Sequence, residues 1–238
     1  MTEREKKLED ILAQFLKPLK GIPFEVAIKS ICEKEVLQFD RSQKMIADTL
    51  DLIINAMRLA GKEARDKKII RPRPNEVGND MEAFVVRGLS AVGLDAAVPK
   101  AFSGKGKSTG YPDVRVKTPA GVVYIEVKTY AADNKDTSFR SFYLSPTDDP
   151  KVHEDGFHLL VGFETLDGGV TGKKDSARRD LRAYEPVGFV IVDLYGLECD
   201  VKFEFNSDNR RLYETSRLLC KENLGQAGTD GHNSLPVP

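Results

Sequence analysis

The sequence has no tryptophan, only three histidines and three cysteines, and no long uninterrupted run of apolar residues. Its cysteines, Cys32, Cys199 and Cys220, are widely spaced without a CxxC pair, which argues against a disulfide framework and a cysteine zinc site and favours a reducing cytoplasm. The histidines form no metal-ligand pattern, and the missing tryptophan excludes no function. Because no stretch is long enough to span a bilayer and the charged N-terminus does not resemble a signal peptide, we expect a cytoplasmic protein without membrane contact.

The charge balance is nearly neutral, with a formal net charge of -1. The field of the whole protein therefore does not favour nucleic acid, although a local basic surface is what matters for binding. Two local clusters of lysine and arginine occur, at residues 65–73 and 173–182. The length of 238 residues and the 40% hydrophobic content fit one substantial soluble domain, or one domain with a helical appendage.

Helical spacing of apolar residues dominates the first part of the chain. We predict helices over residues 3–20, 24–39 and 40–65, with Asp40 as the N-cap of the third. The prolines at positions 72 and 74 then end the helical pattern. We therefore divide the chain into a helical N-terminal region, 1–66, which serves packing or dimerisation, a main domain, 67–223, and a disordered tail, 224–238.

The main domain alternates between helical and strand patterns. Asn75 is a plausible N-cap for a helix over residues 76–92. Strands are predicted at 94–99, 113–117, 122–130, 139–144, 157–165, 188–194 and 199–205, with a final helix at 209–223. The class is α/β, or α+β if the sheet is mostly antiparallel, with a mixed five- to six-stranded sheet flanked by helices.

One hairpin carries an unusual set of charges. Asp113 begins its first strand, and Glu126 and Lys128 lie two residues apart on the returning strand. Side chains alternate between faces along a strand, so Glu126 and Lys128 point the same way while Ile125 points the other. Charges placed like this on an apolar strand suit a site that binds a divalent cation and attacks a phosphodiester. A surface ion pair is the simpler explanation, but it leaves the apolar setting unexplained.

The chemistry assigns a role to each of these groups. Asp113 and Glu126 are the expected ligands of Mg²⁺, and the carbonyl of Val127 could supply a third oxygen. Lys128 would lie near the attacking water and a non-bridging phosphate oxygen, where its charge stabilises the transition state. Whether Lys128 also acts as a general base is left open.

Pro112-Asp113 with Glu126-Val127-Lys128 resembles the PD-(D/E)XK nucleases, and most of all the type II restriction endonucleases. The resemblance covers about residues 75–165 and implies a restriction-endonuclease-like core. It also implies a further acidic residue on the preceding helix, for which Glu82 is favoured and Glu76 is the reserve. Details around Tyr111 and residues 142–146 look closest to the EcoRV-like branch.

The resemblance also implies the cofactor and the partners. It implies Mg²⁺-dependent cleavage of double-stranded DNA at a short specific site, with Mn²⁺ as a substitute and Ca²⁺ binding without cleavage. Palindromic sites pair with two-fold symmetric proteins, so a homodimer is expected. The residues expected to contact DNA are Lys105, Lys107, Arg140, Lys173, Lys174, Arg178 and Arg179.

The same residues are compatible with two alternative functions. A structure-selective or nicking repair nuclease would share the core, and a non-catalytic DNA-binding protein could use a degenerate nuclease fold. Gly106-Lys107-Ser108 is not a P-loop, because Ala101 stands where the first glycine is required. The segment 148–158 holds acidic residues and two histidines in no standard ligand spacing, and we expect a solvated acidic loop there.

Overall fold

The structure is a computed structural model that describes residues 2–7, 10, 20–104, 106, 110–131, 142–144, 147–201, 205–207 and 209–224. Its helical elements are α2 (Phe24–Cys32), α3 (Lys44–Lys67), α4 (Val77–Ala91), α5 (Asn209–Leu212) and the 3-10 turns η1 (Pro74–Glu76) and η3 (Thr215–Arg217). Its strands are β1 (Ile22–Pro23), β2 (Val36–Leu37), β3 (Ile69–Arg71), β4 (Asp95–Ala97), β5 (Val114–Thr118), β6 (Gly121–Ala131), β7 (Phe142–Leu144), β8 (Gly156–Lys174), β9 (Asp180–Asp193), β10 (Glu198–Val201), β11 (Phe205–Ser207) and β12 (Leu218–Asn223).

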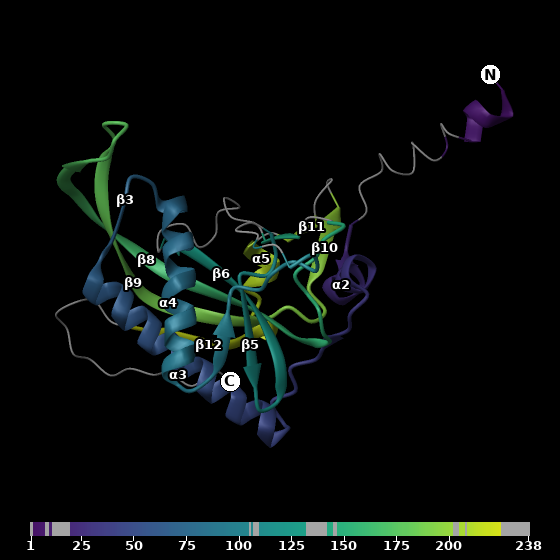
Figure 1. Cartoon of the computed structure of the whole chain (residues 1–238), viewed down its shortest axis with the longest axis horizontal. Helices are drawn as coiled ribbons and strands as arrows, with labels where there is room; N and C mark the ends of the chain where they lie inside the picture. The colour runs from purple at the N-terminus through teal and green to yellow at the C-terminus, as the bar shows by residue number, and fades with distance from the viewer. Residues whose placement is uncertain are drawn as a thin grey trace.

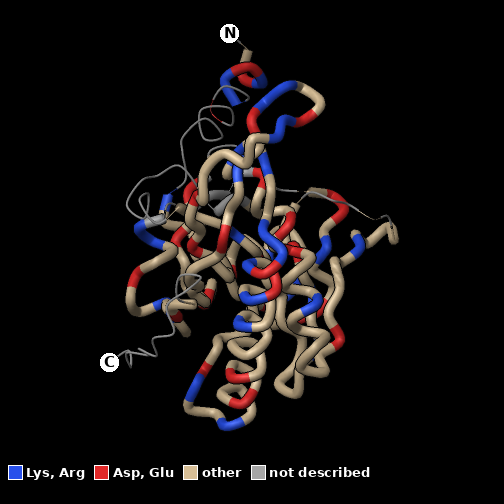
Figure 2. Tube along the Cα trace, turned by 90° about the vertical axis from the view of Figure 1, so that its left-hand side faces the viewer, with Lys and Arg blue, Asp and Glu red and all other residues tan. Residues whose placement is uncertain are grey.

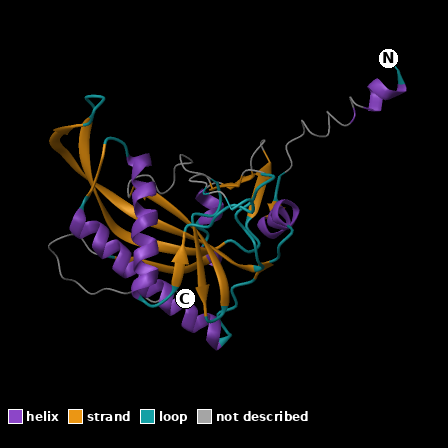
Figure 3. Ribbon diagram, in the orientation of Figure 1, coloured by secondary structure: helices purple, strands orange, loops and turns teal. Residues whose placement is uncertain are grey.

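A mixed sheet forms the centre of the molecule (Figure 1). Its main path runs β12-β9-β8-β6-β5-β4, while β2 pairs with β8 and β3 pairs with β9. The β6–β8 and β2–β8 pairs are parallel and the others in this sheet are antiparallel. Figure 3 shows helices on both sides of the strands. The predicted mixed sheet with flanking helices is thereby confirmed.

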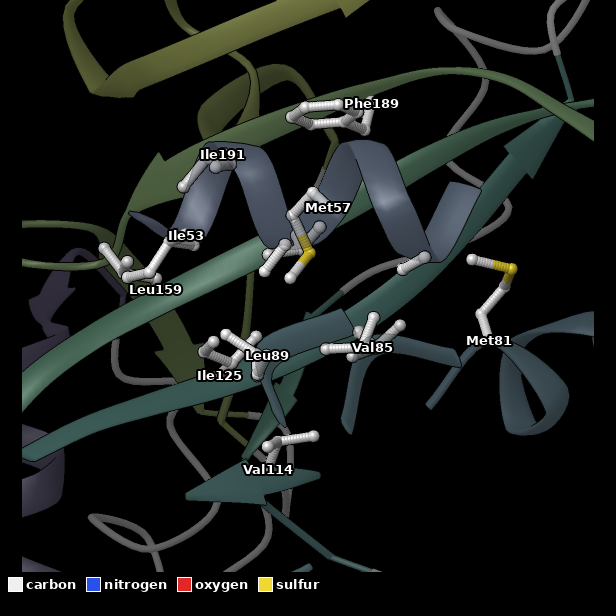
Figure 4. Close-up of a cluster of buried hydrophobic side chains, with 14 of the residues drawn as sticks. Ile53, Met57, Met81, Val85, Leu89, Val114, Ile125, Leu159, Phe189 and Ile191 are labelled. Atoms are coloured by element: carbon white, nitrogen blue, oxygen red, sulfur yellow. The ribbon is translucent and has the colours of Figure 1, made fainter. Parts of the chain in front are cut away.

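Helices α3 and α4 cover one face of this sheet and form the larger core. Ile53 and Met57 of α3 and Met81, Val85 and Leu89 of α4 are buried there (Figure 4). These positions repeat at helical spacing, so each helix turns one apolar stripe toward the strands. Full burial of each such side chain contributes about 1.5–3 kcal/mol. The sheet contributes, among others, Val114, Ile125, Leu159, Phe189 and Ile191.

A smaller layer covers the opposite face. The strand order β1-β10-β11-β7 defines a second sheet within the described residues, and α2 packs beside it. Phe24 and Ile28 of α2 are fully buried against Tyr124 and Leu160 of the central sheet. Tyr124 belongs to this core and Ile125 to the other, which is the alternation of side chains expected for β6.

The predicted helix over 24–39 is too long. Helix α2 ends at Cys32, where Glu33 adopts a left-handed conformation with φ of 56°. Val36 and Leu37 then pair with Gly156 and Phe157 of β8. The apolar residues that suggested a longer helix instead extend the sheet, because β8 offers them hydrogen-bonding partners.

Both predicted N-caps are wrong. Asp40 accepts hydrogen bonds from the backbone and hydroxyl of Ser42 and from Gln43, and Gln43 occupies the N-cap position of α3. Asn75 lies inside η1, and α4 begins only at Val77. In both cases a tight turn comes between the expected cap and the helix.

The C-terminal half departs further from the predictions. Strands β8 and β9 are much longer than the predicted segments 157–165 and 188–194. The single strand predicted at 199–205 is two strands, β10 and β11. The predicted helix over 209–223 is wrong, since α5 has only 4 residues and β12 pairs antiparallel with β9. Residues 218–223 form a strand because the edge of β9 offers hydrogen-bonding partners to their backbone.

Some predictions fall largely or wholly outside the described residues. Residues 3–7 are helical, whereas most of the remaining first helix, part of the strand 139–144 and the tail beyond 224 are not described. The division at residue 66 stays a prediction. Within the part of the chain that the structure describes, no helix is both long and apolar enough to cross a membrane.

Candidate active site

The site lies where β5 and β6 diverge, at Asp113. The last residue pair of the hairpin is Val114 with Ile125, and the Asp113 N–H donates to the Ile125 carbonyl at 3.2 Å. The Asp113 carboxylate then accepts a hydrogen bond from the Val127 N–H at 2.8 Å. A strand residue directs its N–H and C=O to the same side, so the Val127 carbonyl also faces the side that β5 has left.

Glu126 and Lys128 lie together on the face of β6 opposite to α4. The Lys128 Nζ donates to Glu126 Oε1 at 2.6 Å, and Glu126 is only 4% exposed. The other carboxylate oxygen of Glu126, Oε2, is buried and has no hydrogen-bond partner. A buried carboxylate oxygen without a partner is costly unless something else satisfies it.

Glu82 on α4 is the third acidic residue of the site. Its carboxyl group interacts electrostatically with Asp113 and Lys128. Glu76, the reserve candidate, instead lies 3.6 Å from Arg179 in an ion pair. The structure therefore brings Glu82, and not Glu76, to the charges of the hairpin.

Crowding of these acids changes their pKa values. Burial, and then the charge of Asp113, raises the pKa of Glu126 and that of Glu82 to about 7. Burial also raises the pKa of Asp113, against the opposing effect of Lys128. The charged forms of these three carboxyl groups are disfavoured, mainly by burial, and a nearby cation would offset that cost.

Lys128 shows the opposite balance. Burial alone lowers the pKa of this lysine, but the attraction of Glu126 and Asp113 raises it by more, so the net shift is upward. The ammonium form is therefore favoured, and in this geometry one of its three N–H donors, on Nζ, donates a hydrogen bond to Glu126 Oε1.

The donor set fits a hard divalent cation. Two carboxylates, Asp113 and Glu126, and the Val127 carbonyl supply oxygen, which Mg²⁺ prefers while keeping several waters. The partnerless Glu126 Oε2 is the atom that such an ion would satisfy. Among the described residues, no group of three or more His, Cys, Asp and Glu side chains is arranged to hold a metal, so the candidate ligands are these two carboxylates and the backbone carbonyl.

Sequence reasoning missed Lys151. This lysine is 4% exposed, and its Nζ donates to the carbonyls of Gly110 at 2.7 Å and Pro112 at 3.3 Å. Its charge also opposes the upward pKa shifts of Asp113 and Glu82. Lys151 thus holds the loop that ends in Asp113. No spacing signal marks it, because a single lysine in a polar loop looks solvated.

His158 was also misjudged as part of an acidic loop. It is fully buried on β8, and burial lowers its pKa to about 3, so the ring is neutral. Its Nδ1 is hydrogen-bonded to the Tyr111 hydroxyl at 2.5 Å, and the two rings stack. His158 thus holds Tyr111, and Lys151 holds the carbonyls of Gly110 and Pro112. The loop before Asp113 is therefore anchored at two points.

The predicted DNA-contact residues divide into two groups. Lys105, Lys107 and Arg140 lie outside the described residues. Lys173, Lys174, Arg178 and Arg179 lie together at the turn between β8 and β9. In the other basic cluster, Arg71 pairs with Asp80 at 2.6 Å.

Known proteins resemble this chain over most of its length. A model of the type II restriction enzyme MjaV family matches residues 18–216. The type II restriction enzyme MjaV of Methanocaldococcus jannaschii is 33% identical over 239 residues, which cover 92% of this chain and 96% of that protein. The crystal structure of tetrameric restriction endonuclease SfiI bound to cognate DNA aligns with 66% of each chain at 14% identity and a TM-score of 0.37, a likeness too low to support an inference.

Together with these matches, the mixed sheet and its acidic hairpin define a type II restriction endonuclease, a site-specific deoxyribonuclease. The chain belongs to the type II restriction enzyme MjaV family. Family membership confirms the enzyme class predicted from Asp113, Glu126 and Lys128 and decides against the non-catalytic alternative. The narrower EcoRV-like affiliation stays a prediction.

Proposed function

We propose that this enzyme hydrolyses both strands of double-stranded DNA at a short specific sequence, in a Mg²⁺-dependent reaction at Asp113, Glu126, Lys128 and Glu82. The observation that carries the proposal is the buried Glu126 Oε2, which has no hydrogen-bond partner beside Asp113 and Lys128. Family membership favours discrete cuts at a defined site over structure-selective nicking.

The residues of the chain divide the work as follows. Asp113, Glu126 and the Val127 carbonyl hold Mg²⁺, which would supply a polarised water and spread charge on the phosphate. Lys128, favoured as an ammonium ion, donates hydrogen bonds to the attacking water and a phosphate oxygen. Glu82, whose pKa of about 7 lies near neutrality, assists as a further metal ligand or as a group that holds a proton.

Other divalent ions should separate binding from chemistry. Mn²⁺, with a similar preference for oxygen, is expected to replace Mg²⁺ in cleavage. Ca²⁺ is larger and takes more ligands at longer distances, so it is expected to support DNA binding without cutting.

The proposal also covers the oligomeric state of the enzyme and its location in the cell. We propose a homodimer in which each subunit cuts one strand of a two-fold symmetric site, with the helical region 1–66 as the first candidate for the interface. A cytoplasmic location is supported by the free thiols of Cys32, Cys199 and Cys220 within the described structure.

Cleavage of phage DNA by matched variants tests the proposal. We expect the wild type with Mg²⁺ to yield discrete fragments whose sequenced ends define one site. D113N and K128M should cut more slowly by about two to three orders of magnitude, yet still bind the mapped site in Ca²⁺. E82Q should also lose activity, while E76Q, the matched control in the 3-10 turn just before α4, should not.

Two results would contradict the proposed function. If D113N or K128M cut at the wild-type rate, the chemistry does not occur at this hairpin. If cleavage produced only single-strand nicks at irregular structures, the enzyme would be the nicking alternative. Sedimentation of the complex with the mapped site would report whether two subunits bind it.

A further inference from the structure

Strands β8 and β9 continue beyond the central sheet as a separate arm, which we define as residues 166–183. Among the described residues, the pairing of β6 with β8 ends at Ala131 with Thr165. Beyond that point β8 and β9 pair with each other, and only β3 joins them, opposite residues 182–184. Figure 1 shows this arm curling away from the sheet at the upper left.

The arm has no core of its own. No residue from 167 to 180 is buried, and Val170 is 55% exposed. Three register shifts between Glu164 and Lys174 bend and twist the two strands. A bare two-stranded ribbon is only marginally stable by itself, so an arm of this length is retained for what it contacts.

The turn at its tip is nevertheless held firmly. The Asp175 carboxylate accepts hydrogen bonds from the Arg179 N–H at 2.8 Å and from the Arg179 side chain at 2.6 Å. The Arg178 N–H donates to the Asp175 carbonyl at 3.0 Å. The tip is thus presented as a fixed shape.

Arg178 occupies a conformation that its side chain disfavours. Its φ is 60°, in the left-handed region where glycine is the relaxed choice. Strain of this kind persists where the residue has a use that outweighs it. The side chain of Arg178 is exposed at the tip.

The basic residues of the arm fall into paired and free groups. Arg182 pairs with Asp167 at 2.6 Å, Lys174 lies 3.6 Å from Asp180, and Arg179 is bound to Asp175. Lys173 and Arg178 are exposed and have no acidic partner within the described structure. Figure 2, which faces the arm, shows lysine and arginine alternating with acidic residues along its tip. Lys173 and Arg178 are therefore the cations available to a ligand.

The arm is tied to the active site by the register of the sheet. Gly162 of β8 pairs with Lys128 of β6. Lys174 follows Gly162 by twelve positions, a reach of up to about 40 Å at roughly 3.3 Å per residue. One turn of DNA spans about 34–36 Å, and the register shifts bend the arm, so its tip lies within about one turn's length of Lys128.

We propose that the arm binds the phosphates of the duplex DNA that flanks the recognition site, through Lys173 and Arg178. This inference rests on the proposed cleavage of double-stranded DNA at the hairpin site. Phosphate contacts fix the position of the protein without reading sequence, so the arm adds affinity and not specificity.

Flank length gives the first test. Two duplexes carry the mapped site, one ending about 5 base pairs from the cut and the other extending about 20 base pairs, or two turns, on each side. In Ca²⁺ the wild type should bind the long duplex at least about tenfold more tightly, because only it reaches the arm. A K173A/R178G double variant should bind the two duplexes with equal affinity.

The R178G substitution separates an effect on DNA affinity from an effect on folding. Glycine relieves the positive φ, so the thermal midpoint should stay equal or rise while the affinity falls. A shortened arm, in which residues 171–181 are replaced by a two-residue Asn-Gly turn, should behave like the double variant. The charge-matched control is K34A/R41A, because both residues lie near the N-terminal end of β8, away from the arm.

Salt dependence on a duplex of arbitrary sequence gives a test that does not need cleavage. Loss of two phosphate contacts should lower the slope of log K against log salt by about 2 for the arm variant, with no change for the control. An unchanged slope and an unchanged flank effect would overturn the proposal. The proposal would also be overturned if the arm variant lost the oligomeric state of the wild type, because the arm would then be a contact between subunits. Failure of the cleavage proposal would appear separately, as an unreactive wild type in Mg²⁺.

Discussion

At the scale of single residues, the position of Asp113 depends on groups outside the motif that names it. Lys151 holds the two carbonyls before Asp113, and His158 holds the Tyr111 ring beside them. A loop fixed from both sides keeps the carboxylate next to the Val127 N–H. Preorganisation of this kind reduces the free energy that the binding of metal and DNA must spend on ordering the site.

Lys151 is therefore a positioning residue. K151M keeps the length of the side chain but removes its donors, so two carbonyls lose a partner at a cost of about 1–3 kcal/mol in unfolding free energy. We expect kcat for cleavage to fall by about one to two orders of magnitude, with little change in KM for DNA. Single-turnover cleavage and urea denaturation measure the two effects.

Two further variants interpret that result. K151R retains donors and should recover part of the lost rate, which a purely space-filling role would not predict. K117M removes an exposed lysine from β5 and should leave both quantities unchanged. If K151M cleaved like the wild type, Asp113 would not need this anchor.

At the scale of elements, the close packing of α3 on α4 sets where Glu82 lies. A Cβ added at Gly88 would meet the Ala56 carbonyl oxygen of α3 at 2.3 Å. Only glycine allows the two helices to approach this closely. Because α4 also carries Glu82, the spacing of the helices becomes a property of the active site.

G88A tests this contact. Alanine favours a helix by about 1 kcal/mol over glycine, but the clash with backbone should outweigh that gain and lower the unfolding free energy by about 1–3 kcal/mol. G61A on α3 is the matched control, because its added Cβ meets the end of the flexible Leu224 side chain at 2.4 Å and the Phe163 ring only at the ordinary contact distance of 3.6 Å. Equal stability of the two variants in urea would show that the helices do not need this contact.

At the scale of the whole molecule, the buried acids link stability to pH. The unfolded chain releases the Glu126 proton near pH 4.5, whereas the folded chain holds it to about pH 7. Between these values the folded state binds more protons than the unfolded state, so the unfolding free energy falls as pH rises. The contribution of Glu126 is therefore favourable below this window and unfavourable above it.

E126Q should separate stability from activity. We expect it to abolish cleavage but to raise the thermal midpoint of the metal-free protein at pH 8, by the equivalent of about 1–3 kcal/mol. The difference from wild type should shrink at pH 5, where Glu126 is protonated. Calcium should stabilise the wild type at pH 8 and not E126Q. Scanning calorimetry with exposed E3Q as control measures this, and a less stable E126Q at pH 8 would contradict it.

Local pattern predicted much of the helical layer and the catalytic hairpin. The apolar repeat of α3 and α4 and the alternation along β6 are short-range properties, and all three elements lie where expected. Residues 209–223 mark the limit, because β12 becomes a strand through pairing with β9 and not through its own pattern. The same long-range pairing hid the length of β8 and β9.

The sequence by itself indicated the enzyme class: Asp113 before the hairpin and Glu126 and Lys128 on its returning apolar strand suit metal-assisted phosphodiester cleavage, and their pattern resembles the type II restriction endonucleases. Only the tertiary structure decided which groups surround them. It brought Glu82 to the hairpin and turned Glu76 toward Arg179, and it buried Lys151 behind Asp113. Those choices depend on contacts between residues far apart in the chain, which no local spacing encodes.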